Sequence, residues 1–305
     1  MAWAGFGSLI ALAALLIAAG CQSPPVEAMP AASPSARPTR SSIDLPAVPA
    51  AISPTPAATP VSVPAATATP LPVWSGPDII GYSALGRPLN AYRLGAGPIK
   101  RALIGGLHGG YEANTTRLMS ATLDYLREHP EAIPPEITLF IVPLANPDGY
   151  AAGTDALVGR MNGRGVDLNR NWDYQWQMTA THGTRPVFAG RAAFSEPETR
   201  ALRDFILRHN MDAVIFYHSV FAAVFHGAGD AQSHTVELAR RVAQATDYTL
   251  RPEGVPGQIT TGNAIDWLSV NGIAAIEVEL STRHGLDWEQ NLRGLQAFLS
   301  WRPPR

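Results

Sequence analysis

The sequence has one cysteine in 305 residues, and charged side chains make up only 16% of it. A single thiol excludes a disulfide within the chain, so the folded part needs an adequate hydrophobic core for its stability. The net charge is only −2. A balance so close to neutral gives no indication of a nucleic-acid partner or of a polybasic membrane-binding surface.

Long apolar runs are also scarce. Residues 9–19 form an apolar run of signal-peptide length that is too short to span a bilayer comfortably. Gly20 and Cys21 follow it, which resembles a bacterial lipoprotein processing site and implies that residues 1–20 are a signal peptide and that Cys21 is lipidated. A plain cleaved signal peptide and an uncleaved anchor stay open, because no Lys or Arg precedes the run and Ala18 replaces the preferred leucine. We expect an exported protein, anchored at the cell surface or membrane as a lipoprotein.

The segment that follows is expected to be a tether. Residues 22–73 hold 13 of the 27 prolines, mixed with Ala, Ser and Thr, and contain four charged residues. Such a composition cannot bury enough apolar surface to offset the entropy of ordering. We therefore predict a lipid-anchor cysteine and disordered linker over residues 21–73, followed by one domain over residues 74–305.

From residue 74 onward, strand-like and helix-like patterns alternate. We predict strands at 89–94, 102–107, 137–143, 213–218 and 273–280, and helices at 114–127, 196–208, 234–245, 264–270 and 288–299. Ser195 and Glu198 have the spacing of a capping box at the start of the second helix. The alternation predicts an α/β domain with a mostly parallel sheet, whose functional site lies at the C-terminal ends of strands.

Histidine and acidic residues lie at several of these strand ends. His108 and Glu112 follow a strand within a run of four glycines, where an imidazole and a carboxylate can face one metal ion. His218 ends another strand. Taken alone, each can equally be structural: a glycine-rich turn, or a histidine satisfied by hydrogen bonds. Glu277 and Glu279 lie on one face of an apolar strand, which is costly unless they are paired or functional.

Four segments together resemble the zinc carboxypeptidases related to carboxypeptidase A, and most closely their compact bacterial members. They are "GVDLNRNWD" (165–173), "SEPE" (195–198), His218-Ser219 and "GNAIDW" (262–267). The resemblance covers about residue 79 to the C-terminus. It implies a three-layer α/β/α sandwich with a mixed, mostly parallel central sheet, and one zinc ion as cofactor.

The resemblance also implies roles for individual residues. His108, Glu112 and His218 correspond to the zinc ligands, Asp167 to the carboxylate that orients the first ligand histidine, and Glu279 to the catalytic base. Arg160 corresponds best to the arginine that stabilises the oxyanion, although Arg164 competes with it. Asn169 and Arg170 match the pair that binds the terminal carboxylate of the substrate. Ser219 and Ile265 are further candidates for substrate binding, and the apolar Ile265 suggests a neutral side-chain pocket.

The chain departs from the family pattern between the first two ligands. Three residues separate His108 from Glu112 where the family usually has two, which leaves the position of Glu112 the least certain of the ligands. The expected activity is hydrolysis of a peptide or cell-wall peptide by a monomer. A deacylase of the aspartoacylase type is the alternative enzyme, because that group shares the Asp-x-Asn-Arg stretch. An inactive binding module is the alternative from another class. The other histidines are interpreted as structural, with His226 a candidate to line the cleft.

Overall fold

The computed structural model describes residues 74–229, 233–252, 254 and 260–303. All of them belong to the unit Ala66–Arg305, the second of two units into which the chain divides. The predicted signal peptide, lipidated Cys21 and linker lie outside the described residues. In the described part of the chain, every helix is too short or too polar to cross a membrane.

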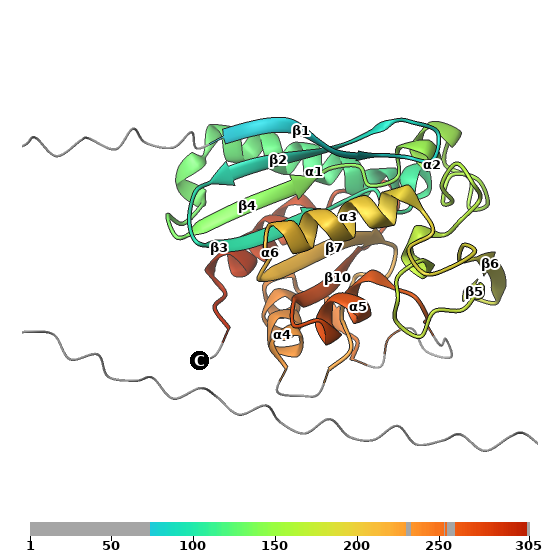
Figure 1. Ribbon diagram of the computed structural model, residues 1–305. Coiled ribbons are helices and arrows are strands. Elements are labelled where there is room, and N and C mark those ends of the chain that lie inside the picture. Colours follow the sequence, from blue (N-terminus) through green and yellow to red (C-terminus); the bar gives the residue numbers. More distant parts are fainter. Residues whose placement is uncertain (1–73, 230–232, 253, 255–259, 304–305) are drawn as a thin grey trace, which may run out of the picture. The chain divides into compact units, whose positions relative to one another are not determined.

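The domain is built around an eight-stranded mixed sheet with the strand order β1-β2-β4-β3-β7-β10-β8-β9 (Figure 1). The four central strands β4, β3, β7 and β10 are parallel. Strands β1 and β2 pair antiparallel with their neighbours, and β8 is antiparallel to β10 but parallel to β9. The strands are β1 (Trp74–Tyr82), β2 (Pro88–Gly95), β3 (Ile99–Ile104), β4 (Ile137–Val142), β7 (Ala213–Ser219), β8 (Ala223–His226), β9 (Thr249–Leu250) and β10 (Ala274–Leu280).

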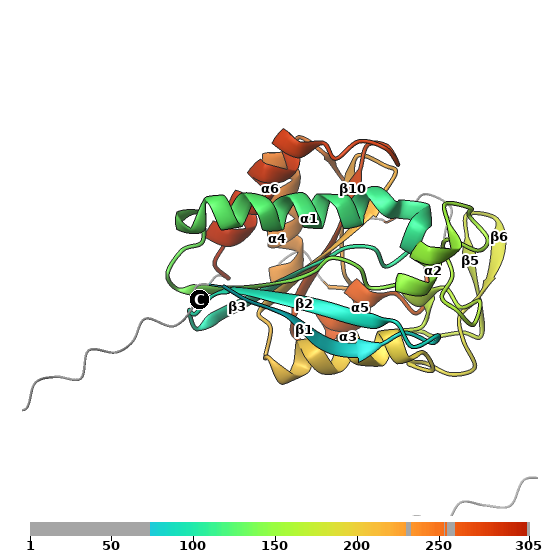
Figure 2. The same ribbon diagram turned by 90° about the horizontal axis from the view of Figure 1, so that it is seen from above.

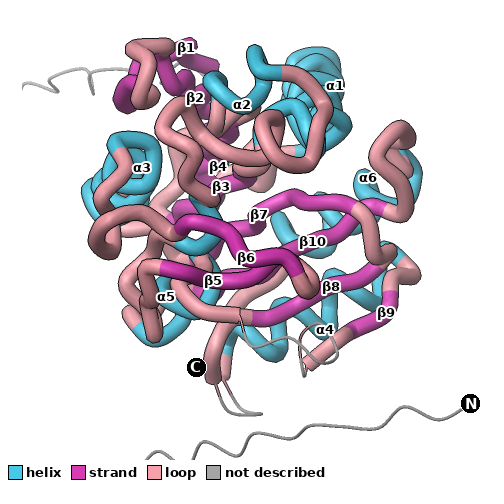
Figure 3. The backbone as a smooth tube through the Cα atoms, turned by 90° about the vertical axis from the view of Figure 1, so that its right-hand side faces the viewer, coloured by secondary structure: helices cyan, strands magenta, loops and turns pink. Residues whose placement is uncertain are grey.

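Helices cover both faces of the sheet, so the architecture has three layers. Helices α1, α4 and α6 lie on one face, and α3 and α5 on the other (Figure 2). A separate hairpin of β5 and β6 lies at the end toward which the parallel strands run (Figures 1 and 3). The remaining bounds are α1 (Ala113–Glu128), α2 (Pro147–Ala152), β5 (Thr179–His182), β6 (Arg185–Phe188), α3 (Pro197–Arg208), α4 (His234–Thr246), α5 (Ala264–Val270) and α6 (Trp288–Ser300).

Side chains of the buried strands point alternately to the two faces of the sheet, so the domain has two hydrophobic cores. In β7, Ile215 and Tyr217 pack with α1, α4 and α6, whereas Val214 and Phe216 pack with α3 and α5. Successive side chains of a strand point to opposite faces, so strands covered on both sides are apolar throughout. The even-numbered residue His218 therefore lies on the α3/α5 face of the sheet.

The predicted fold class and nearly all predicted elements are confirmed, with bounds that differ by at most one residue. The strand predicted at 102–107 is the exception, because β3 spans Ile99–Ile104. The backbone leaves the strand at Gly105 and turns at Gly106, whose φ of +63° is in the left-handed region. Leu107 nevertheless stays buried, and this explains why its apolar character was taken for strand.

The predicted capping box is wrong. Glu196 is the N-cap of α3 and Pro197 is its first residue, and no side chain caps the helix. Glu198 is instead buried and accepts hydrogen bonds from the Ala84 backbone N–H and the Asn162 side chain. These tertiary partners hold the carboxylate away from Ser195. Strand β1 was not predicted because it is a partly exposed edge strand with no continuous apolar pattern.

Helix α3 offers a matched test of how the core stabilises the domain. Leu202 is fully buried, whereas Leu207 is 45% exposed. We expect Leu202→Ala to lower the free energy of unfolding by about 2–5 kcal/mol, through lost burial and the cavity left behind. Leu207→Ala, in the same helix, should change it by only about 0.5 kcal/mol. Denaturant unfolding measures both, and equal losses would contradict the packing described here.

Candidate metal centre and cleft

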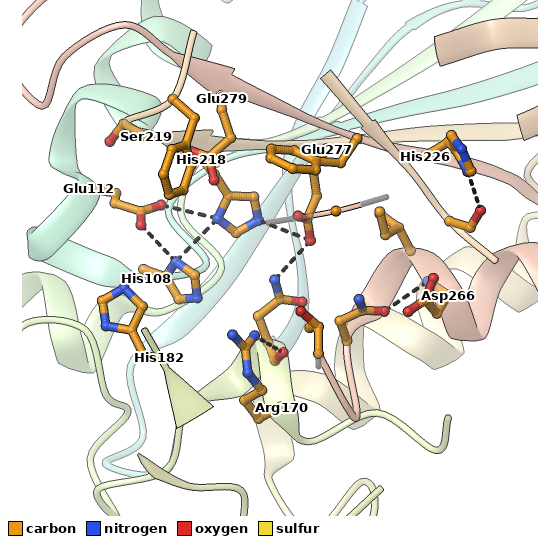
Figure 4. A pocket seen from close by; sticks show the side chains of 18 of the residues that line it. His108, Glu112, Arg170, His182, His218, Ser219, His226, Asp266, Glu277 and Glu279 are labelled. Atoms are coloured by element: carbon orange, nitrogen blue, oxygen red, sulfur yellow. Dashed lines mark hydrogen bonds and ion pairs between the residues drawn. The ribbon is translucent and has the colours of Figure 1, made fainter. Parts of the chain in front are cut away.

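Three predicted metal ligands converge at the C-terminal ends of β3 and β7. His108 follows β3, Glu112 lies at the start of α1, and His218 is in β7. Glu112 Oε1 is 2.9 Å from His108 Nδ1, and Glu112 Oε2 is 3.1 Å from His218 Nδ1. The two Nδ1 atoms are 3.2 Å apart. One ligand atom from each side chain lies within 4.8 Å of the others (Figure 4).

Glycines allow the His108–Glu112 segment to turn this tightly. Gly106 and Gly109 have φ angles of +63° and +49°, which residues with a Cβ rarely adopt. A Cβ on Gly110 would lie 2.2 Å from the carbonyl oxygen of Gly153. The glycine run thus brings the backbone close to a neighbouring loop, and Glu112 reaches the centre despite the extra residue between it and His108.

A second layer of polar groups holds His108. Asp167 Oδ1 is 3.4 Å from His108 Nε2, and its Oδ2 accepts a hydrogen bond of 2.8 Å from Arg160 Nε. The Asn169 backbone N–H donates to Asp167 Oδ1 at 3.0 Å. The contact with Asp167 is longer than a hydrogen bond, and His108 Nε2 has no hydrogen-bond partner among the described residues, while Nδ1 faces Glu112 and His218. A carboxylate behind a ligand histidine is a common feature of metal sites, because it fixes the tautomer.

The electrostatics of the centre favour a bound cation. Burial alone would raise the pKa of Glu112, but His108 and His218 hold it well below its usual range. Burial lowers the pKa of His218, yet Glu277 and Glu112 outweigh it and raise this pKa to about 9. Without metal, a proton on His218 is thus the positive charge that these carboxylates attract. Two nitrogens and one carboxylate are a donor set that zinc accepts, with a fourth position left for water.

The two candidate arginines differ sharply in position. Arg160 is buried, and its Nη1 lies 3.0 Å from His108 Nδ1 and 3.5 Å from Glu112 Oε1. The Arg164 side chain is 54% exposed and pairs with Glu196 at 3.5 Å. Of the two, only Arg160 is therefore at the centre, and its role in stabilising the oxyanion stays a prediction.

Both strand glutamates line the same cleft, which has a volume of about 630 Å³. Glu279 is aligned with His218 in the β7–β10 pairing, and Glu277 is aligned with Phe216. Glu279 is 8% exposed, and its Oε2 has no hydrogen-bond partner among the described residues. Burial, followed by the charges of Glu112 and Glu277, raises the pKa of Glu279 to about 8. A cation bound beside it would lower that pKa again.

The residues predicted to bind substrate also line the cleft. Arg170 is held by the carbonyl oxygens of Asn169 (2.7 Å) and Thr181 (3.1 Å). Asn169 Oδ1 accepts from the Ala264 N–H, and its Nδ2 donates to Glu277 at 2.9 Å. Ser219 and Ile265 are buried cleft residues as well. The predicted site residues from His108 to Glu279 are thus brought to one place.

Several cleft residues were not found from the sequence. His226, the candidate from the sequence, does line the cleft, and so does His182, which the sequence did not single out. Its place in the hairpin beside the site could not be read from local pattern. Arg283 also lines the cleft; it lies 3.8 Å above the Tyr111 ring and donates to the Tyr111 hydroxyl at 2.6 Å. Asp266 is a further missed cleft residue, hidden in the "GNAIDW" motif.

Known proteins share this architecture. Residues 68–291 match the family model described as zinc carboxypeptidase. Zinc carboxypeptidase A 1 of Anopheles gambiae is 29% identical over 56% of this chain and 44% of its own length. Murein peptide amidase A of Escherichia coli (strain K12) is 28% identical over 75% of this chain and 91% of its own length. The chain spans about half the length of the curated relatives that it matches first.

Solved structures agree with the fold. Bovine thrombin-activatable fibrinolysis inhibitor, in complex with a tick carboxypeptidase inhibitor, has a TM-score of 0.64 at 19% identity, over 73% of this chain and 88% of that one. An aspartoacylase family protein from Mesorhizobium loti has a TM-score of 0.53 at 19% identity, over 76% and 68% of the two chains. At these identities the likeness shows the fold alone.

Zinc binding by substituted proteins should distinguish the metal ligands from the residues that only lie near them. We expect His218→Ala to lose stoichiometric zinc, because two side chains cannot replace three. Asp167→Asn should keep the fold and weaken zinc affinity by roughly 10- to 100-fold, the usual effect of removing such an orienting partner. The measurements are elemental analysis after dialysis and competition with a chelator.

His182→Ala is the matched control, because this histidine lines the cleft but does not belong to the three-residue group. It should retain one zinc ion per chain. Stoichiometric zinc in His218→Ala would show that the metal is held elsewhere.

Proposed function

The chain belongs to the zinc carboxypeptidase family, and on that premise we propose that it hydrolyses the amide bond to the C-terminal residue of a peptide or cell-wall peptide. The observation that carries the proposal is the buried convergence of His108, Glu112 and His218 beside Glu279 in one cleft. A cleft of about 630 Å³ is in the size range of small-ligand sites. The murein peptide amidase relative supports a cell-wall peptide as the substrate.

The proposed reaction needs an activated water molecule and a group that accepts its proton. A zinc ion held by the three ligands would supply an electrophile and a water molecule of lowered pKa. Glu279 accepts the proton of that water as the scissile carbonyl is attacked, and then donates it to the leaving nitrogen. Its buried Oε2, which lacks a partner among the described residues, is free for this exchange.

Other polar side chains of the cleft can bind the negative charges of the reacting substrate. Arg160, fixed by Asp167, donates to the oxygen of the scissile carbonyl as negative charge develops there. Arg170 and Asn169 receive the terminal carboxylate of the substrate, for which the planar guanidinium is well shaped. Ser219 and Ile265 line the same cleft and can contact the substrate there.

The alternative of a small-substrate deacylase of the aspartoacylase type is not favoured. The matched family model is that of the zinc carboxypeptidases, and the likeness to the aspartoacylase protein is one of fold. Hydrolysis of N-acetylaspartate in preference to an N-acylated dipeptide would reverse this choice. An inactive binding module would bind zinc and hydrolyse neither compound.

Glutamine substitutions test the proposed base. Glu279→Gln keeps size and removes the proton acceptor, so it should bind zinc normally and lose turnover by about a hundredfold or more. Glu277→Gln should lose far less on a dipeptide with a neutral terminal side chain. The assay uses zinc-loaded enzyme, and activity should disappear on chelation and return with zinc.

The reverse pattern, with Glu277→Gln inactive and Glu279→Gln nearly normal, would show that the base is the other glutamate. Full activity after complete removal of metal would contradict the proposed function itself.

We also propose that the protein is exported and anchored through a lipid on Cys21. The proposal is supported by the apolar run at residues 9–19, directly followed by Gly20 and the only cysteine of the sequence. The Pro-rich segment up to residue 73 would then tether the catalytic domain at a distance from the membrane.

Cys21→Ser tests this anchor. The wild-type protein should sediment with membranes, and the variant should shift to the soluble fraction while retaining hydrolytic activity. Stable anchoring takes more than one acyl chain, so mass spectrometry of the mature N-terminus should show more than one. Ser41→Ala, a neighbouring change in the tether, should leave the distribution unaltered. A soluble wild-type protein that begins at another residue would contradict the proposal.

A further inference from the structure

One side of the cleft carries two carboxylates. It is the side that lies beyond His218 as seen from His108 and Glu112. Glu277 and Asp266 lie on that side (Figure 4). Glu277 comes from β10, and Asp266 comes from the first turn of α5. Neither residue is needed to hold the metal or to accept the proton of water in the proposed reaction. Their presence in the wall of a catalytic cleft therefore calls for another explanation.

Glu277 lies between the metal centre and the groups expected to bind a terminal carboxylate. Its Oε1 is 3.8 Å from His218 Nε2 on one side and 2.9 Å from Asn169 Nδ2 on the other. The side chain is 14% exposed, so it is accessible from the cleft. Among the described residues, no Lys or Arg nitrogen forms an ion pair with it, and its one ionic contact is with His218. Its other polar contact is the hydrogen bond donated by Asn169, so in the described part of the chain no side-chain cation other than this imidazole touches the carboxylate.

Asp266 strengthens the negative field at the same wall. In the part of the chain described, it forms no ion pair, and its carboxylate is held by the Asn263 side chain and the Ala228 backbone N–H. Burial, together with the charge of Glu277, raises the pKa of Asp266 to about 6. Two neighbouring carboxylates that repel each other are stabilised by a cation beside them.

The apolar neighbours define the shape of the group that would fit. Ile265 and Phe225 line the cleft close to these carboxylates in sequence and in sheet pairing, since Phe225 is aligned with Glu277 between β8 and β10. An aliphatic stem can pack on such side chains while its charged end reaches the carboxylates. The neutral pocket that Ile265 suggested is therefore only the stem portion of a pocket with an acidic end.

We infer that Glu277, assisted by Asp266, selects a leaving residue whose side chain ends in an ammonium or guanidinium group. The inference rests on the proposed function, because it assumes that the residue released occupies this side of the cleft. The terminal carboxylate then binds Arg170, and the side-chain cation lies between Glu277 and Asp266. A substrate with a neutral side chain leaves Glu277 beside that carboxylate without a counter-charge, so like-charge repulsion disfavours it.

The test compares N-acylated dipeptides that share one acyl part and end in lysine, norleucine or Nε-acetyl-lysine. Norleucine keeps the aliphatic stem, and acetyl-lysine keeps the length; both lack the charge. With zinc-loaded full-length protein, we expect kcat/KM for the lysine substrate to exceed the other two by roughly 10- to 100-fold, as a hydrogen bond to a charged group supplies.

Substitutions assign that preference to residues. Glu277→Gln should lower kcat/KM for the lysine substrate and thereby remove most of the preference for lysine over norleucine. Asp266→Asn should remove part of that preference. Glu128→Gln is the matched control, because Glu128 is an exposed residue at the end of α1 outside the cleft. It should leave the ratio unchanged. If Glu277→Gln lowers kcat/KM for both substrates by the same factor, Glu277 only positions Asn169 and the inference is overturned.

A binding measurement keeps this inference separate from the proposed function. Calorimetry with zinc-loaded Glu279→Gln should show free lysine bound more tightly than norleucine, and adding Glu277→Gln should abolish the difference. Neither measurement of binding requires turnover. Absence of hydrolysis with every dipeptide would contradict the proposed function, whereas equal binding of lysine and norleucine would overturn the inference.

Discussion

Two imidazole nitrogens and a carboxylate face each other in a space almost closed to water, and this arrangement constrains the rest of the site. His108, Glu112 and His218 are each at most 3% exposed. Lone pairs gathered in this way repel each other unless a cation lies among them. The position of Asp167 beside His108, the turn made by the glycines and the position of Arg160 are all consistent with this requirement. They are the means by which the chain keeps three donors aimed at one point.

The topology of the sheet explains how residues far apart in the sequence meet at the metal centre. The parallel strands β3, β7 and β10 end at one edge, so the loop after β3, the last residues of β7 and the last residues of β10 share a boundary. Pairing in register aligns Glu279 with His218. Along β10 the alternate residues Ile276, Val278 and Leu280 enter the core on the opposite face. Glutamates are tolerated in this strand because their face opens into the cleft.

The cleft is lined by charged side chains of both signs. Arg283, stacked on Tyr111, and Arg160 lie on the side of Glu112, with Arg283 Nη1 3.9 Å from Glu112 Oε1. Glu277 and Asp266 lie beyond His218. Arg170 and Glu279 line the same cleft, so charged groups of both signs surround the space within it.

Hydrophobic periodicity in the sequence predicted the fold class, five strands and five helices, because it expresses local physical requirements. The metal and catalytic candidates came from the resemblance of four short segments to a known family. Only the tertiary structure shows that Arg160 lies buried at the centre and Arg164 lies exposed outside it. It alone brought His182 and Asp266 to the cleft, and it gave Glu198 partners 36 and 114 residues away, which displaced the predicted cap. Each of these outcomes depends on contacts between segments far apart in the chain, which no local pattern records.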